Sequence, residues 1–395
     1  MISKIRQILF TLAIFVCNAA VAQPSDTIVS FVNIYPGSEI YELEGHSVIR
    51  LEMPEADIAI SYGTYDFDQP NFVYRFVKGE TDYWVTAIPW DYIERAYSRE
   101  NRRIVAHRLN LTSQQKQRLI DLLKYNLQPE NRTYRYNYVK DNCATRPLNM
   151  VEAALGDSIV LGEALQPLDS EQSFRSVMRH YHANYPWYQF GIDLALGSGI
   201  DYPISNREKA FAPVVLDYQL LEATVNGSRL VDTVLVVNDM RPDAAVLAPT
   251  PWYASPIAVC TLILIIAILL TIKDLRRKKI TRWFDATLFG IFGLAGCVIT
   301  FLVFISVHEA TSPNILLLWL NPFCLIPTIF IWINRCKLII FSYQIVNFVA
   351  LMVLLTLSAF GVQVLNLAFI PLILADAIRA ASYIYLNIKS IKCRE

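Results

Sequence analysis

The chain has 395 residues, of which 54% are hydrophobic and 18% charged, and its positive mean hydropathy of +0.33 is typical of a protein that lies partly in a membrane. Lysine plus arginine equal aspartate plus glutamate at 35 each, so the formal charge is zero. Basic residues gather only beside the apolar segments described below, which argues against a nucleic-acid partner.

The N-terminal segment 1–22 has the pattern of a cleavable secretory signal. A positively charged start is followed by an apolar run at 8–16, and Ala20-Val21-Ala22 has the small-residue spacing of a cleavage site. The chain that follows is therefore expected outside the cytoplasm. A retained signal anchor is the alternative.

Residues 23–250 are predicted to form one periplasmic α+β domain. Alternating or β-rich runs predict strands at 27–35, 47–51, 58–62, 83–88, 104–109 and 230–237. Helices are predicted from 112 onward, at about 170–181 and at about 207–224. The first of these opens on Thr112 and Gln115, which have capping-box spacing.

Residues 251–395 are predicted to form an all-α bundle of about five transmembrane helices. A proline-punctuated stretch, with Trp252 and Tyr253 as interfacial aromatics, marks the boundary before them. Apolar segments of spanning length follow at 256–272, 284–307, 315–333, 338–360 and 362–384. The connectors after the first, third and fifth segments carry the lysines and arginines, so the C-terminus is predicted to be cytoplasmic and the bundle to lie in a bacterial inner membrane.

Several polar residues interrupt these apolar segments, and each is costly in hydrocarbon unless it has a partner. They are Asn314, Asn321, Gln363, Asn366, Asp376 and Arg379. They are expected either to line a substrate groove or to pack between helices. Arg379 follows Asp376 by three residues, a spacing that predicts a pair on one helix face.

One cysteine stands out in the periplasmic domain. Of seven cysteines, only Cys143 lies between the signal and the spans, so it has no partner for a disulfide within its own domain. It sits in the polar run 141–146, directly before an apolar helical pattern. Backbone N–H groups and the helix dipole at such a position are expected to lower the pKa of a thiol and to form an oxyanion hole, so Cys143 is predicted to be a nucleophile. A buried cysteine serving as a small hydrophobe is the alternative.

A cysteine nucleophile needs a base, and histidine is the usual one. His46 follows a glycine at the start of a predicted strand and is the preferred candidate. His180 and His182 follow Cys143, as in ordinary papain-like enzymes, and compete with it. Their spacing of two suits no metal site by itself, and His107, in an apolar strand, is interpreted as structural.

Three stretches together resemble the Lnb N-terminal periplasmic domain: 36–47, which contains His46; 61–72, which contains Ser61-Tyr62-Gly63-Thr64-Tyr65-Asp66-Phe67; and 141–146, which contains Cys143. The similarity extends through 192–197 and into the spans at 308–322. It implies a permuted papain-like fold in which histidine precedes cysteine. The implied activity is lipoprotein N-acyltransfer: an acyl chain moves from a phospholipid to the N-terminal lipid-modified cysteine of a lipoprotein, without a cofactor or metal.

The resemblance also implies roles for individual residues. Cys143 is then the nucleophile, His46 its base, and Ser61 or Tyr62 the group that orients the base. The expected substrate-binding residues are Asn142, Arg146, Tyr65, Asp66, Asn71 and Arg75. A cell-wall peptidase of the same class remains a rival, as does a non-enzymatic receptor or assembly factor that binds through exposed aromatics.

Overall fold

The computed structural model describes residues 26–163, 173–240 and 249–392, so the predicted signal at 1–22 lies outside the described residues. The described chain divides into two units. The first takes residues from the ranges 1–72, 80–181 and 203–247, and the second takes residues from 73–79, 182–202 and 248–395. Two segments that precede the predicted boundary near residue 250 therefore belong to the second unit.

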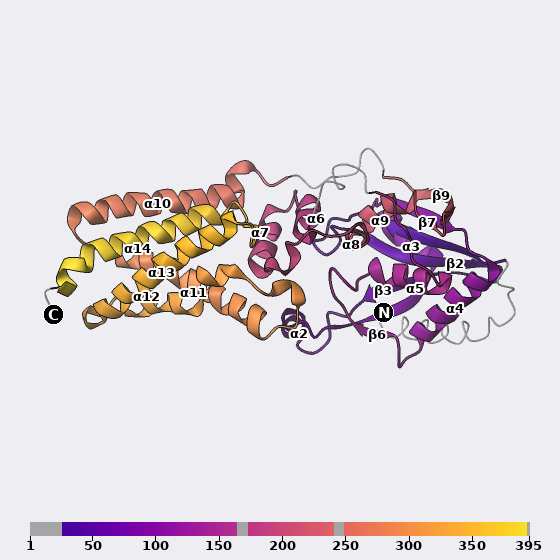
Figure 1. Ribbon diagram of the computed structural model, residues 1–395, viewed down its shortest axis with the longest axis horizontal. Helices are drawn as coiled ribbons and strands as arrows, with labels where there is room; N and C mark the ends of the chain where they lie inside the picture. The colour runs from indigo at the N-terminus through magenta and orange to yellow at the C-terminus, as the bar shows by residue number, and fades with distance from the viewer. Residues whose placement is uncertain (1–25, 164–172, 241–248, 393–395) are drawn as a thin grey trace. The chain divides into compact units, whose positions relative to one another are not determined.

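The first unit is built on an antiparallel sheet of seven strands in the order β6-β4-β3-β2-β1-β5-β9 (Figure 1). Its strands are β1 (Ile28–Ile34), β2 (His46–Met53), β3 (Ala56–Thr64), β4 (Asp82–Pro89), β5 (Ile104–Leu109), β6 (Thr133–Arg135) and β9 (Val231–Asn238). The hairpin β7 (Thr224–Val225) to β8 (Ser228–Arg229) stands apart from it. All six predicted strands are confirmed, whereas the three-residue β6 is too short to be predicted by alternation.

Helices cover both faces of this sheet, because side chains alternate across a strand. They are α3 (Trp90–Arg99), α4 (Ser113–Leu127), α5 (Thr145–Leu155), α6 (Phe174–Tyr181), α8 (Asn206–Lys209) and α9 (Pro213–Leu220). Ile49 and Ile60 lie in one buried cluster with residues of α4 and α5, and Val48 and Ala59 lie in another with Trp90 of α3. The expected α+β fold is confirmed.

Local signals set two of the helix boundaries. Thr112 caps α4 in the predicted capping box with Gln115. The predicted helix at 207–224 is instead two helices, α8 and α9, because Pro213 cannot donate the backbone hydrogen bond that a continuous helix would need there.

The second unit contains four helices long and apolar enough to cross a membrane. They are α10 (Pro256–Arg277), α11 (Arg282–Phe304), α13 (Lys337–Ala359) and α14 (Phe369–Lys392). The unit also contains α2 (Phe72–Lys78), all but its first residue, and α7 (Pro186–Ala195). A continuous helix was also expected at 315–333. That segment is instead interrupted: η6 (Ile315–Leu318), η7 (Pro322–Cys324) and α12 (Leu325–Phe330) follow one another.

This interrupted segment nevertheless passes along the whole of α11 in the opposite direction. Thr311 Oγ1 donates to the carbonyl of Leu302 at 2.8 Å near one end of α11, and Arg282 Nη2 donates to Asn334 Oδ1 at 3.0 Å at the other. Between them, a Cβ added at Gly296 would overlap the backbone of Asn321. The chain therefore traverses the bundle five times, once without a continuous helix.

Asparagine and proline explain the interruption. Asn314 and Asn321 each accept a hydrogen bond from the backbone N–H two residues ahead, which favours a new short helical turn over continuation of the previous one. Pro322 and Pro327 then withhold the N–H groups that a longer helix would use.

One buried ion cluster joins three of the passes. Arg379 of α14 pairs with Asp285 of α11 at 2.6 Å and with Asp274 of α10 at 2.8 Å, and its Nη1 donates to Thr271. The predicted pairing of Arg379 with Asp376 is wrong, because two carboxylates on neighbouring helices take the guanidinium. Removing Arg379 would leave the two buried carboxylates uncompensated, at a cost of about 3–5 kcal/mol.

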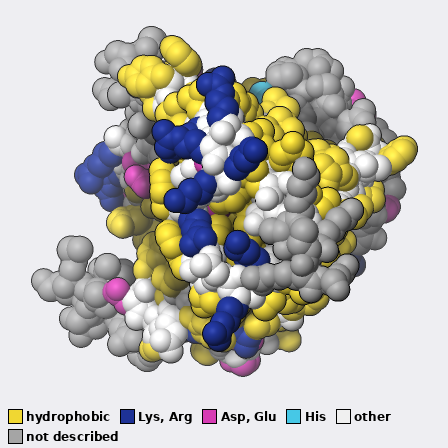
Figure 2. Space-filling view, turned by 90° about the vertical axis from the view of Figure 1, so that its left-hand side faces the viewer, with side chains coloured by type: hydrophobic (Ala, Val, Ile, Leu, Met, Phe, Trp, Pro, Cys, Tyr) yellow, Lys and Arg dark blue, Asp and Glu magenta, His cyan; other side chains and the backbone are white. Residues whose placement is uncertain are grey.

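Lysines and arginines gather at one end of the bundle (Figure 2). Lys278 and Lys279 follow α10, Arg282 opens α11, and Lys337 opens α13, and together they line one small polar cavity of about 140 Å³. The connectors at the other end of these passes, 305–314 and 360–368, contain no lysine or arginine.

Because basic connectors stay on the cytoplasmic side, five passes predict a cytoplasmic C-terminus. A reporter fused after Glu395 is expected to be active only there, and a fusion within 360–368 only in the periplasm. Periplasmic activity of the Glu395 fusion would show that the interrupted segment does not cross.

Candidate active site

Cys143 lies in a tight turn that leads into α5. The turn follows a β-bridge between Asn137 and Asp141, and helical geometry begins at Thr145. The predicted position of Cys143 directly before a helix is confirmed.

Asn142 holds this turn in place. Its Oδ1 accepts from the backbone N–H groups of Ala144 at 2.9 Å and Thr145 at 3.0 Å, while its Nδ2 donates to the carbonyls of Tyr138 and Phe211, each at 2.8 Å. Asn142 was expected to bind substrate, but its buried amide is committed to the backbone on both sides of the thiol.

The thiol of Cys143 is half-buried, and burial raises its pKa to about 11. Hydrogen bonds from the backbone N–H of Ser47, the hydroxyl of Tyr136 and the backbone of Cys143 itself lower that pKa but do not offset burial. The expectation of a lowered pKa is therefore wrong for the resting site. The thiol is protonated near neutral pH.

His46 opens β2, one residue before the backbone N–H that contacts the thiol. Its Nε2 lies 2.9 Å from Ser61 Oγ on the adjacent strand β3. Burial, together with the positive charge of Arg102, lowers the pKa of His46 to about 4. The imidazole is therefore neutral near pH 7 and able to accept a proton.

These contacts place His46 and Cys143 at the same end of β2, although neither contact joins the imidazole directly to the sulfur. Tyr97 of α3 is close to both: its ring centroid lies 6.5 Å from that of His46, and its pKa is raised mainly by burial, with a smaller contribution from a charge on Cys143. With Nε2–H donating to Ser61, Nδ1 keeps the free lone pair that a general base requires.

Strand alternation separates the two candidates for the orienting group. Ser61 lies on the face that carries His46 and contacts it. Tyr62 points to the opposite face, where it is buried in the core cluster, and its hydroxyl has no hydrogen-bond partner among the described residues. The geometry therefore favours Ser61 over Tyr62.

The remaining predicted substrate-binding residues do not converge on the thiol. Arg146 forms a two-bonded ion pair with Asp141 and stacks over Tyr134. Tyr65 packs in an aromatic cluster with Phe67, Phe72 and Tyr83.

The other three lie in surface positions or elsewhere in the chain. Asp66 is exposed and accepts from the backbone N–H of Asp68. Asn71 is exposed with a positive φ of 56°, as suits a turn residue. Arg75 lies in α2, within the second unit.

The competing histidines have other environments. His107 is fully buried and its Nε2 lies 2.6 Å from Asp217, in keeping with the structural role expected for it. His182, in the second unit, is buried with its Nδ1 2.7 Å from Gln189 Oε1. His180 is exposed on α6. None of these contacts involves Cys143.

Two residues that affect the site, Tyr136 and Arg102, were not predicted from the sequence. Tyr136 donates to the thiol, and the alternating tyrosines at 134, 136 and 138 directly before the cysteine were the available signal. Arg102 acts on His46 from a distant loop, where it is buried against Glu42 and Tyr97, and no local pattern marks it. Across the ranges that the structure describes, no group of three or more His, Cys, Asp or Glu side chains is arranged to hold a metal ion.

Comparison with known families accounts for both parts of the chain. The family model for the Lnb N-terminal periplasmic domain matches residues 18–177, which include His46, Ser61 and Cys143, and the model for the Lnb transmembrane domain matches residues 249–391. The chain belongs to the Lnb family. It is therefore a membrane protein with a periplasmic domain and transmembrane helices, in keeping with an inner-membrane location. No curated protein and no solved structure matches it.

The thiol chemistry of this Lnb-family protein should depend on pH in a distinctive way. Alkylation follows the thiolate fraction, so a pKa of about 11 predicts that the iodoacetamide rate at Cys143 rises roughly tenfold per pH unit from pH 7 to 10. An ordinary thiol levels off above its pKa of about 8.5. Peptide mass spectrometry would assign the label, with glutathione as reference. A plateau below pH 8 would instead indicate a thiolate–imidazolium pair.

Proposed function

We propose that the protein is a thiol-dependent lipoprotein N-acyltransferase that uses Cys143 as nucleophile and His46 as base. The observation that carries the proposal is the arrangement at the start of β2. The thiol of Cys143 accepts a hydrogen bond from the backbone N–H of Ser47, and the preceding residue, His46, has a neutral imidazole held by Ser61. Nucleophile, base and orienting group are the parts that cysteine acyl transfer requires.

In the first half-reaction, His46 takes the proton of the Cys143 thiol as the sulfur attacks an ester carbonyl of a phospholipid. The tetrahedral intermediate collapses to a thioester, and the lysophospholipid alcohol leaves with the proton from His46. The backbone N–H of Ser47 and the hydroxyl of Tyr136, which contact the sulfur at rest, are well placed to stabilise charge near it.

In the second half-reaction, the α-amino group of the lipid-modified N-terminal cysteine attacks the thioester. His46 accepts the amine proton and returns it to the departing sulfur, which regenerates the thiol and leaves an amide on the lipoprotein. Both substrates carry acyl chains that lie in the membrane, so a catalytic domain joined to a transmembrane bundle suits this reaction better than peptide hydrolysis in the cell wall.

Replacing His46 with alanine is expected to lower acyl transfer by about 10²–10⁴-fold, the usual contribution of a general base. His180→Ala is the control, because His180 is exposed and expected to be dispensable. Thermal unfolding would confirm that His46→Ala is folded. Normal transfer in His46→Ala, with loss in His182→Ala, would assign the base to the unpermuted papain order.

Incubating the purified protein with phospholipid, without a lipoprotein acceptor, is expected to leave an acyl adduct on Cys143. Intact-protein mass spectrometry should detect it, and hydroxylamine should remove it because a thioester is labile. Cys143→Ser should fold yet form no such adduct and transfer little. Transfer at a normal rate without any adduct would indicate direct attack by the amine and a different role for Cys143.

A further inference from the structure

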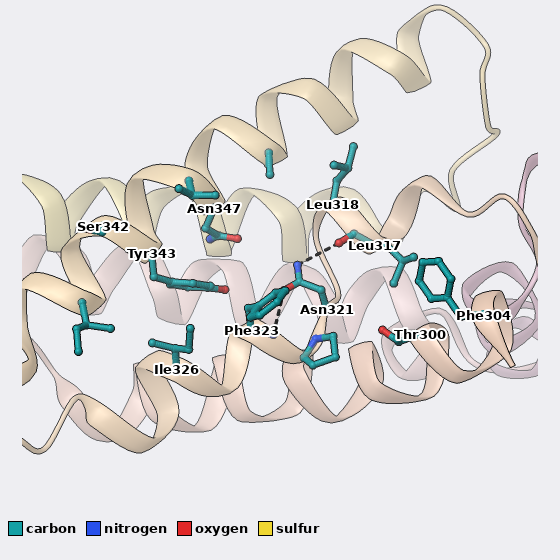
Figure 3. A pocket seen from close by; sticks show the side chains of 14 residues that line it. Thr300, Phe304, Leu317, Leu318, Asn321, Phe323, Ile326, Ser342, Tyr343 and Asn347 are labelled. Carbon is teal, nitrogen blue, oxygen red and sulfur yellow. Dashed lines mark hydrogen bonds between the residues drawn. The ribbon is translucent and has the colours of Figure 1, made fainter.

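A cavity of about 670 Å³ lies within the transmembrane bundle, between α11, the interrupted pass and α13 (Figure 3). Its walls are mainly apolar, with Phe304 from α11, Leu317 and Ile326 from the interrupted pass, and Ile339 and Ala350 from α13. The volume falls in the range of pockets that bind small molecules, about 300–1,000 Å³.

The cavity is elongated along the helices. Its α13 lining follows one helical stripe from Ile339 to Ala350, a length of about 16 Å at 1.5 Å per residue. On α11 the lining ends at Phe304, the last helical residue and the end away from the basic connectors. Phe323 and Val346, which are 68% and 67% exposed, stand at its rim and face the lipid. The cavity therefore runs parallel to the acyl chains of a bilayer and opens toward them.

Polar groups also line this cavity. A gap filled only by hydrocarbon chains would need none. Thr300 lines it, and its buried hydroxyl has no hydrogen-bond partner among the described residues. Tyr343, from α13, extends into it, and Asn321, from the interrupted pass, stands at its wall with its amide bonded to the backbone of Leu317 and Phe323 (Figure 3).

A buried carboxylate lies behind one wall. Asn347 lines the cavity, is only 4% exposed, and donates to Asp376 Oδ1 at 2.6 Å. The second oxygen of Asp376 has no partner within the described parts of the chain. Polar groups left unpaired in hydrocarbon are costly, so the cavity suits an amphiphile with a long apolar chain and hydrogen-bonding ester oxygens.

We propose that this cavity binds one acyl chain of a diacyl glycerophospholipid, with the hydroxyl of Thr300 at its ester end. This assignment rests on the proposed acyltransferase function, for which the bound lipid is the acyl donor. The donor is favoured over the lipoprotein because the opening faces the bilayer itself, where phospholipid is the bulk component and can enter sideways without a polypeptide attached.

The test uses the full chain with Cys143→Ser, reconstituted in vesicles that contain a phospholipid with a photoreactive diazirine at the end of one acyl chain. After irradiation, peptide mass spectrometry is expected to find labels concentrated on the cavity lining at 300–304, 317–326 and 339–350. Ala350→Phe fills the cavity and should lower this labelling at least fivefold. Val349→Phe is the matched control, since Val349 faces lipid outside the cavity lining and should leave the labelling unchanged.

Even labelling of all lipid-facing helices, or labelling insensitive to Ala350→Phe, would overturn the proposal. So would displacement of the probe by an N-blocked lipidated peptide at far lower concentration than by phospholipid, because the cavity would then hold the acceptor. A second arm keeps the native Cys143: the rate of acyl-adduct formation should fall in Ala350→Phe and not in Val349→Phe. A normal adduct in Ala350→Phe would refute the cavity as donor site while leaving the role of Cys143 intact.

Discussion

The amide of Asn142 fixes the turn that holds Cys143 beside the first residues of β2. Its oxygen caps the N–H groups that follow Cys143, and its nitrogen binds carbonyls of Tyr138 and of Phe211, a residue far along the chain. The start of α5, and with it the sulfur, is thereby held against the backbone of β2 at Ser47. Without these bonds the buried backbone groups of the turn would be unsatisfied, and the thiol would lose its fixed position beside the strand that carries His46.

Burial of Cys143 and His46 determines the charge of the site at rest. Burial disfavours both the thiolate and the imidazolium, raising one pKa to about 11 and lowering the other to about 4. The pair is therefore neutral on both members over the physiological range. A neutral thiol is a poor nucleophile, so the acyl transfer that we propose requires proton transfer to His46 as part of the attack. A neutral thiol is also less readily oxidised than a thiolate.

The sequence predicted much of this fold because its signals are local. Alternation located the six long strands, and the polar run before an apolar helix located Cys143 at the start of α5. Cys143, His46 and Ser61, to which the resemblance assigned the roles of nucleophile, base and orienting group, all lie near the start of β2, and their catalytic roles stay predictions. The predicted substrate-binding residues do not gather at the thiol. A polar residue beside a motif can instead bond the backbone, as Asn142 does, or pair with a neighbouring charge, as Arg146 does with Asp141. Tyr136 and Arg102 act through long-range packing that no spacing reveals.

In the bundle, two kinds of buried polar residue have different consequences. Arg379 is fully compensated by Asp274 and Asp285, so it ties three passes together and leaves no group to bind a ligand. The interrupted pass, in contrast, leaves space beside it. Its backbone at Asn321 lies so close to α11 that only a glycine fits at position 296, and short turns there replace the side-chain layer that a full helix would present to α13. The space between this pass and α13 is left underfilled. Among the residues that the structure describes, Thr300 and Asp376 each have a side-chain oxygen without a partner beside or behind that space. Helix interruption thus creates the room and the polarity that a lipid ester requires.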